Sequence, residues 1–199
     1  MATAGNPPTD VEIRKAIAAC IRTALVDLYG ATLANAVRIH DHWLWGFSLG
    51  ENAALLSVTS GAEIGKVHGW MIGLAGVSRT RPQPNTNTPQ GVYHLRKTNP
   101  NRRDDLRNYR VWCYHQIDAG TDGMESDENS ENRLAIELAA VSDEISRQNI
   151  LGIDNEWVMG HEELQFPLID VFKFGGIQAN VAQGTLGVRL QQPLDLTQY

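Results

Sequence analysis

The residues whose types and spacing could do chemistry are His40, Asp41 and His42. Apolar and polar residues alternate around them, which predicts a strand over 37–43. Because residues i and i+2 share one face of a strand, both imidazoles could approach a single metal ion. A third ligand would have to come from a distant histidine: His68, His94, His115 or His161. No second cluster at ligand spacing supports a metal site. A histidine pair at a surface or interface is therefore the favoured interpretation, and we expect no metal and no cofactor.

The other motifs with catalytic potential are incomplete. His161 is followed by two glutamates, but the second histidine of a zinc-protease helix is missing one turn later. The glycine-rich run over 66–79 matches neither a dinucleotide-binding nor a phosphate-binding loop; inside a strand such glycines mark a bulge or a close approach of the backbone. The adjacent acids Asp104 and Asp105 stand among polar residues, which is typical of solvated charge. We therefore expect a protein that is not an enzyme.

Charge is distributed unevenly along the 199 residues, whose net charge is −6. Residues 1–90 carry a net +1, residues 91–117 a net +4, and residues 118–199 a net −11. An acidic chain argues against a dedicated nucleic-acid-binding protein, since phosphate binding requires a basic face. The contrast between a basic and an acidic segment suits a subunit that assembles head to tail with copies of itself.

The basic segment is the candidate interface. Its proposed contact residues are Arg96, Lys97, Arg102, Arg103 and Arg107. Three interpretations remain open: a solvated loop with local ion pairs, a contact with a sister subunit or another protein, and a contact between arginines and nucleic-acid phosphates. The acidic stretch 118–131 supplies a complementary surface in the same chain.

A first helix is predicted over about residues 10–29. Thr9 and Glu12 form a capping-box pattern at its start, and Gly30 is placed to end it. No stretch of the chain reaches the roughly 18 to 20 uninterrupted apolar residues that a membrane-spanning helix needs. We therefore expect no membrane segment.

A second helix is predicted over about 131–148, with Ser130 as its cap. A seam of apolar residues has the spacing of a single buried face: Leu134, Leu138, Val141 and Ile145. The cysteines, Cys20 and Cys113, stand among apolar and aromatic residues. They are expected to be buried thiols in a reducing cytosol.

Strands account for most of the remaining pattern. They are predicted over 53–59, 66–79, 93–97, 109–117, 157–161, 168–174, 177–183 and 185–190. Both faces of the strand 109–117 carry large apolar residues, which indicates a central strand or an edge that another subunit covers. The element order predicts one α+β domain over 9–190: a mostly antiparallel sheet with the two helices packed on it. A flexible leader (1–8) and a C-terminal tail (191–199) flank it.

The order of these elements resembles the tail terminator, or tail-completion, proteins of long-tailed bacteriophages. The resemblance is carried by the helix TDVEIRKAIAACIRTALVDLYG, the aromatic strand YRVWCYHQID, the helix ENRLAIELAAVSDEISRQNILG and the strands of LIDVFKFGGIQANVAQGTLGVRL. It covers most of residues 9–190. It rests on the order of the elements and on the general character of their residues.

The resemblance implies a structural virion protein without catalytic residues. Such a protein forms a ring, hexameric in the family, that caps the tail tube, stops its polymerisation and joins it to the head-side connector. Its partners are the tail-tube and connector proteins, and DNA passes through the ring without sequence-specific recognition. It is located in the neck or tail of the virion and in the host cytoplasm during assembly. The alternatives are another neck or connector protein, a tail-tube protein, a nucleic-acid-binding module using 96–110, and a metal-dependent enzyme using His40 and His42.

Overall fold

The computed structural model describes residues 8–42, 44, 53–80, 102–117, 124–148, 163–174 and 177–195. Its elements follow one another as α1 (Asp10–Ala36), β1 (Arg38–His40), the 3-10 turn η1 (Ala53–Leu56), β2 (His68–Thr80), β3 (Arg102–Ile117), α4 (Met124–Arg147), β4 (Glu163–Phe174) and β5 (Ile177–Asp195). The predicted leader, apart from Pro8, and the strands predicted at 93–97 and 157–161 lie outside the described residues.

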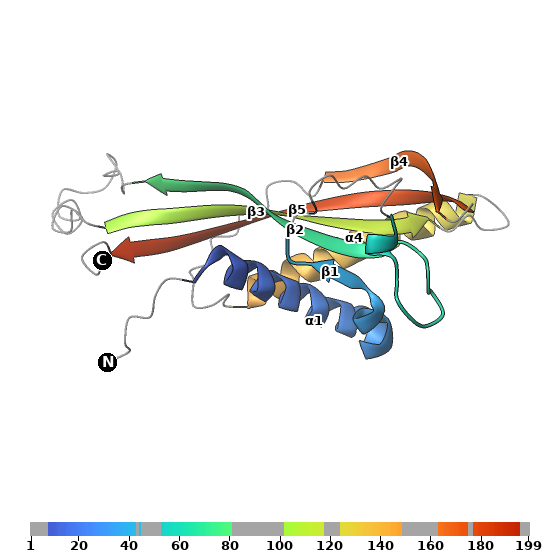
Figure 1. Cartoon of the computed structure of the whole chain (residues 1–199), viewed down its shortest axis with the longest axis horizontal. Coiled ribbons are helices and arrows are strands. Elements are labelled where there is room, and N and C mark those ends of the chain that lie inside the picture. The colour runs from blue at the N-terminus through green and yellow to red at the C-terminus, as the bar shows by residue number, and fades with distance from the viewer. Residues whose placement is uncertain are drawn as a thin grey trace.

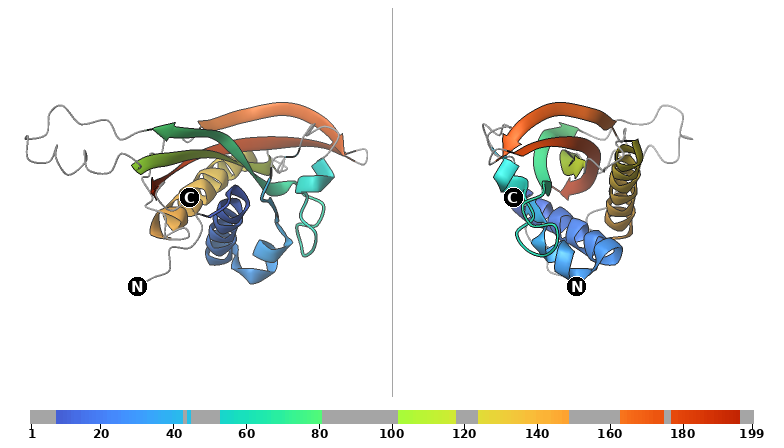
Figure 2. Two further views of the ribbon diagram at one scale, coloured as in Figure 1. Left: turned by 60° about the vertical axis from the view of Figure 1, so that its left-hand side comes forward. Right: turned by 90° about the vertical axis from the view of Figure 1, so that its right-hand side faces the viewer.

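The described strands form one five-stranded sheet in the order β1-β2-β3-β5-β4. β1 pairs with β2 in parallel, and the other pairings of described strands are antiparallel. Both helices lie on the same side of the sheet (Figure 1, Figure 2). This confirms the predicted α+β fold with a mostly antiparallel sheet, an N-terminal helix and a second helix packed on it.

Helix α1 begins where its sequence predicts, but it continues beyond its predicted end at Gly30. The Thr9 hydroxyl accepts a hydrogen bond from the Glu12 amide, and the Glu12 carboxylate accepts one from the Thr9 amide. Gly30 has a φ of 78°, which interrupts the helix at the predicted end, and a short second helical segment then continues to Ala36. By length and composition α1 could cross a membrane, but in this fold its apolar side packs in the core: Ile13, Ile17, Ile21 and Leu25 are fully buried.

Helix α4 confirms the second predicted helix but begins earlier, at Met124, so that Ser130 lies inside it and is not its cap. The stretch 124–130 contains acidic residues, and negative charge in the first turns of a helix is stabilised by the helix dipole. The four residues of the predicted seam are fully buried. Glu137 lies fully buried with them, and this position was not part of the predicted seam.

Strand β3 is the central strand of the sheet, which decides between the two alternatives that its sequence left open. Tyr109, Val111 and Cys113 belong to the main core under the helices. Tyr114 and Trp112 belong to a smaller apolar cluster that also contains Met71, Val67, Leu56 and Val181. Alternate residues of β3 therefore pack on opposite faces of the sheet, as the pattern predicted.

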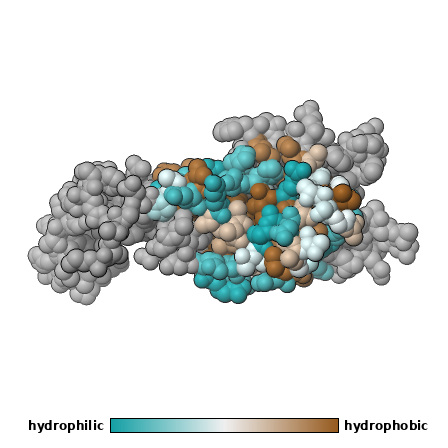
Figure 3. Space-filling model, turned by 60° about the horizontal axis from the view of Figure 1, so that its bottom comes forward, coloured by the Kyte–Doolittle hydropathy of each residue, from teal (hydrophilic) through white to brown (hydrophobic). Residues whose placement is uncertain are grey.

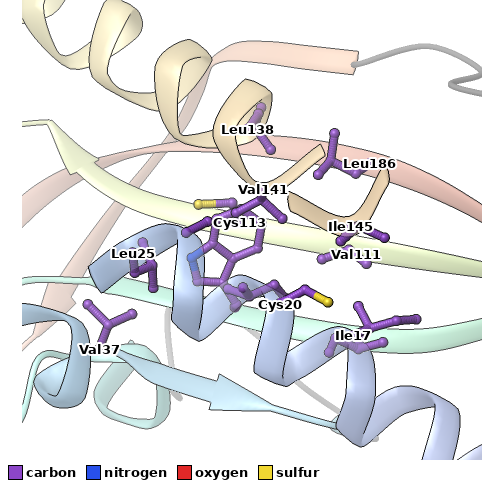
Figure 4. Close-up of a cluster of buried hydrophobic side chains, with 14 of the residues drawn as sticks. Ile17, Cys20, Leu25, Val37, Val111, Cys113, Leu138, Val141, Ile145 and Leu186 are labelled. Carbon is purple, nitrogen blue, oxygen red and sulfur yellow. The ribbon is translucent and has the colours of Figure 1, made fainter. Parts of the chain in front are cut away.

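The main core joins α1, α4 and the middle of the sheet. Figure 4 shows Ile17 and Cys20 of α1 and Leu138, Val141 and Ile145 of α4 around Val111 and Cys113 of β3. The contact is close enough that a Cβ added at Gly184 of β5 would lie 2.4 Å from the Leu138 side chain. Gly69 of β2 is equally constrained, because an added Cβ would lie 2.9 Å from Leu56. Both cysteines are buried and free, as predicted.

Several predicted boundaries in the sheet are wrong. Strand β1 ends at His40, before the rest of the 37–43 run, and the residues at 53–56 form η1 instead of a strand. Strand β3 starts at Arg102, seven residues before its predicted start, since pairing with β2 and β5 continues through a polar stretch that was expected to be a loop. Strand β5 runs without interruption to Asp195, five residues into the predicted tail, because β3 pairs with it over that whole length.

Candidate functional site

Two features of the fold could carry a function, and the first is a three-stranded arm. We define the arm as Gly76–Thr80 of β2, Arg102–Arg107 of β3 and Leu190–Asp195 of β5. The register joins these segments: Val77 is opposite Arg107, and Arg102 is opposite Asp195. In Figure 1 these strand ends extend past α1 to one end of the molecule.

Both edges of the arm are open within the described part of the chain. Strand β1 pairs with β2 only at Gly69–Met71. Strand β4 pairs with β5 only as far as Thr185. From those points to the tip, each outer strand has β3 as its one described partner. An open edge offers unpaired backbone donors and acceptors to a strand of another chain.

Apolar side chains are exposed where the arm leaves the body of the protein. Leu74 is 44% exposed and Val77 is 50% exposed. Leu74 is opposite Tyr109 and Val77 is opposite Arg107, so all four side chains share the face of the sheet that bears the helices. A bulge between Leu74 and Gly76 keeps the two aliphatic residues on that face despite their odd spacing. Elsewhere on the helix side, Figure 3 shows hydrophobic and hydrophilic side chains interspersed.

The five predicted interface residues fall in and next to this arm. Arg107 is half-buried, and its guanidinium donates a hydrogen bond of 3.1 Å to the Pro8 carbonyl, which ties the start of α1 to β3. Arg102 and Arg103 lie on β3 opposite Asp195 and Leu194 of β5. Arg96 and Lys97 lie outside the described residues.

The predicted histidine pair has other partners. His40 Nε2 lies 2.7 Å from the Leu55 carbonyl oxygen, and His42 Nδ1 lies 3.0 Å from the Asp41 carboxylate. The two rings meet edge to face with centroids 6.0 Å apart. Of the four histidines considered as a third ligand, His94 and His161 lie outside the described residues, and the other two lie elsewhere in the fold.

Those two histidines, His68 and His115, form the second feature, a buried polar cluster with Glu137. The register of β2 and β3 places His68 directly opposite His115, with ring centroids 4.5 Å apart. Helix α4 brings Glu137 onto the pair, and ligand atoms of the three residues lie within 4.8 Å of one another. All three are buried.

The Glu137 carboxylate accepts hydrogen bonds from three elements. Its Oε1 accepts from His68 Nε2 at 2.8 Å and from Trp70 Nε1 at 3.0 Å, and its Oε2 accepts from the Tyr29 hydroxyl at 3.0 Å. Cys113 Sγ lies 3.8 Å from Oε1. One buried acid thus joins α1, α4 and the central strands, which satisfies a charge that would otherwise be costly to bury.

Burial, together with charges and hydrogen bonds inside the cluster, sets the pKa values of its members. It raises the pKa of the Cys113 thiol, with the Glu137 carboxylate adding to the effect. Burial and the neighbouring His68 lower the pKa of His115 to about 4. Burial alone would raise the pKa of Glu137, but the hydrogen bond and charge of His68 outweigh it and hold this pKa below its usual range. At neutral pH the cluster therefore contains an ionised Glu137 and a neutral His115.

Sequence patterns identified the members of this cluster only in part. His115 stands in the alternating run of the central strand, and His68 lies in the strand predicted over 66–79; each was considered only as a third ligand for His40 and His42. Glu137 carried a signal that was not used: it lies three residues after Leu134 and four before Val141, on the apolar seam. No family model and no curated protein matches this chain.

Proposed function

We propose that this protein is a tail terminator of a long-tailed bacteriophage, a ring-forming subunit that caps the tail tube. The proposal rests on the resemblance of the element order and on one observation, the three-stranded arm with two open edges. An arm of this kind is a strand-pairing surface that the described strands of the chain leave unused.

The two edges of the arm are different, because one is formed by β2 and the other by β5. If the β2 edge of one subunit meets the β5 edge of the next, the contact is heterologous, and its repetition closes into a ring when the rotation permits. The β5 edge belongs to the acidic segment 118–199, and the β2 edge lies next to the basic strand β3, so the contact would bring the two charged segments of neighbouring subunits near each other.

In this proposal each exposed apolar side chain contributes more to the assembly energy than each exposed ion pair does. Fully covering a leucine or valine side chain contributes about 1.5–3 kcal/mol, and Leu74 and Val77 are each half covered already. An exposed ion pair contributes about 0.2–1 kcal/mol. The arginines of the basic segment would therefore select the orientation of the partner, while the aliphatic residues and strand edges hold it.

Termination follows from geometry in this proposal. One face of the ring binds the end of the tube, and the other face lacks the tube's own subunit interface. Further tube subunits cannot add there, and the head-side connector docks instead. DNA passes through the ring, which requires no base-reading residues.

Negative-stain imaging of the full chain, alone and with tail tubes of its own phage, tests this function. We expect single closed rings at tube ends. The double variant Leu74→Asp with Val77→Asp should abolish the rings but leave a folded monomer. Ile136→Asp is the matched control, since Ile136 is 57% exposed on α4, away from the arm, and it should form rings normally. Open-ended filaments would identify a tube protein instead, and a monomer that never binds tubes would refute the proposal.

A further inference from the structure

The buried cluster leaves two imidazole nitrogens without a partner among the described residues. His68 Nδ1 and His115 Nε2 are fully enclosed, and neither makes a hydrogen bond. Their residues are only 1% and 6% exposed. Buried polar atoms without hydrogen-bond partners are rare and costly, so the presence of two of them in one cluster requires an explanation.

The other nitrogen of each ring has an oxygen partner. His68 Nε2 lies 2.8 Å from the Glu137 carboxylate, and His115 Nδ1 lies 3.1 Å from the Gln116 carbonyl oxygen. If each of these nitrogens carries the hydrogen, the unpartnered nitrogens carry lone pairs. Metal-binding histidines show the arrangement of His115, in which a carbonyl holding one N–H orients the other nitrogen toward the ion. At His68 the oxygen partner is Glu137 itself, which would exchange this hydrogen bond for a bond to the ion.

We infer that His68, His115 and Glu137 form a structural site for a divalent transition metal of the zinc class. The donor set of two imidazoles and one carboxylate suits zinc and excludes calcium and magnesium, which prefer oxygen ligands. The Glu137 carboxylate supplies a negative charge to the site. The nearby Arg133 does not cancel it, since its guanidinium is paired with Glu63 at 3.3 Å.

The dimensions of the cluster are close to those of a bound state. Ligand atoms around a tetrahedral zinc are roughly 3.3 Å apart, given bonds of about 2.0–2.1 Å. The three residues have ligand atoms within 4.8 Å of one another, so the longest separation would have to shorten by up to about 1.5 Å when an ion binds. Because the ligands come from β2, β3 and α4, the ion would join three elements. Binding would stabilise the fold, and three protein ligands leave the fourth position of a tetrahedral zinc for a further ligand such as water.

Metal analysis of the full chain tests the site. Protein purified without chelators should contain about one zinc ion per chain. Stripped protein should take up about one equivalent of Zn²⁺ or Co²⁺ and melt several degrees higher with the metal than with a chelator. His115→Gln should weaken binding at least about tenfold. The double variant His40→Gln with His42→Gln is the matched control and should bind as the wild type does.

Two results would overturn the inference. One is wild-type protein that binds no stoichiometric metal and melts at the same temperature with zinc and with chelator. The other is binding that disappears in the His40 and His42 variant, which would place the ion on the surface pair. Both measurements remain decisive if His115→Gln fails to fold, and neither depends on whether the protein forms rings.

Discussion

Replacing His115 by glutamine should make the protein less sensitive to acid. The unfolded chain binds a proton on this imidazole near its ordinary pKa of 6.5, whereas in the folded protein the pKa is about 4. Between these values the unfolded state binds more protons than the folded state, so stability falls as the pH falls. The groups facing the ring act together: His68 from β2, Glu137 and Arg133 from α4, and the surrounding burial.

The magnitude follows from the two pKa values. Each pKa unit corresponds to about 1.4 kcal/mol, so the full effect of His115 is about 3 kcal/mol, and about 2.5 kcal/mol of it should be lost between pH 7.5 and 4.5. Glu137 acts in the same direction at lower pH, because its depressed pKa gives stability that is lost as the pH falls through the acid range below 4.5. The two residues together predict progressive loss of stability in acid.

Denaturant unfolding at several pH values, with a chelator present, measures the effect. The difference between the free energies of unfolding at pH 7.5 and 4.5 should be about 2.5 kcal/mol larger in the wild type than in His115→Gln. His42→Gln controls for the loss of an imidazole outside the cluster. Parallel pH profiles of the wild type and His115→Gln would refute the reasoning. So would an NMR titration of the wild type in which the His115 ring protonates near pH 6.5.

Three further substitutions should change stability in proportion to the contacts they disturb, each measured by denaturant unfolding. Gly184→Ala should cost about 1–3 kcal/mol, because its Cβ would overlap the buried Leu138 side chain; an unchanged midpoint would contradict the close packing of α4. Thr9→Ala should cost about 1 kcal/mol by removing the cap of α1, and equal stability would mean that the capping box contributes nothing. Glu137→Ala should cost about 3–5 kcal/mol, because two buried donors and the half-buried Tyr29 hydroxyl lose their acceptor; a loss below 1 kcal/mol would show that the cluster is not a structural centre.

The sequence correctly predicted those features that depend only on residues close together in the chain. The cap of α1 and the apolar seam of α4 depend on residues within one or two helical turns. The two-sided alternation of β3 depends on period-2 spacing. All three predictions are confirmed. The glycine-rich run was predicted to mark a bulge or close approach, and β2 has both: a bulge between Leu74 and Gly76, and Leu56 pressed against Gly69.

Strand ends and the buried cluster could not be predicted in this way. Polar residues around Arg102 indicate a loop when they are considered alone, but pairing with strands on both sides keeps them extended. The cluster depends on the register that places His68 opposite His115, which no spacing in the sequence encodes, and on the docking of Glu137 from α4, for which the only signal is its place on the apolar seam. The predicted His40 and His42 pair was conspicuous because its members are adjacent in sequence, whereas His68 and Glu137 are 69 residues apart.

Native mass spectrometry of the full chain, alone and after incubation with tail tubes of its own phage, tests the central claim most directly. The account predicts one closed assembly of fixed mass, a hexamer as in the proteins it resembles, which Leu74→Asp with Val77→Asp reduces to monomers and Ile136→Asp leaves intact. A chain that stays monomeric under both conditions, or that forms assemblies of unlimited size, would contradict it.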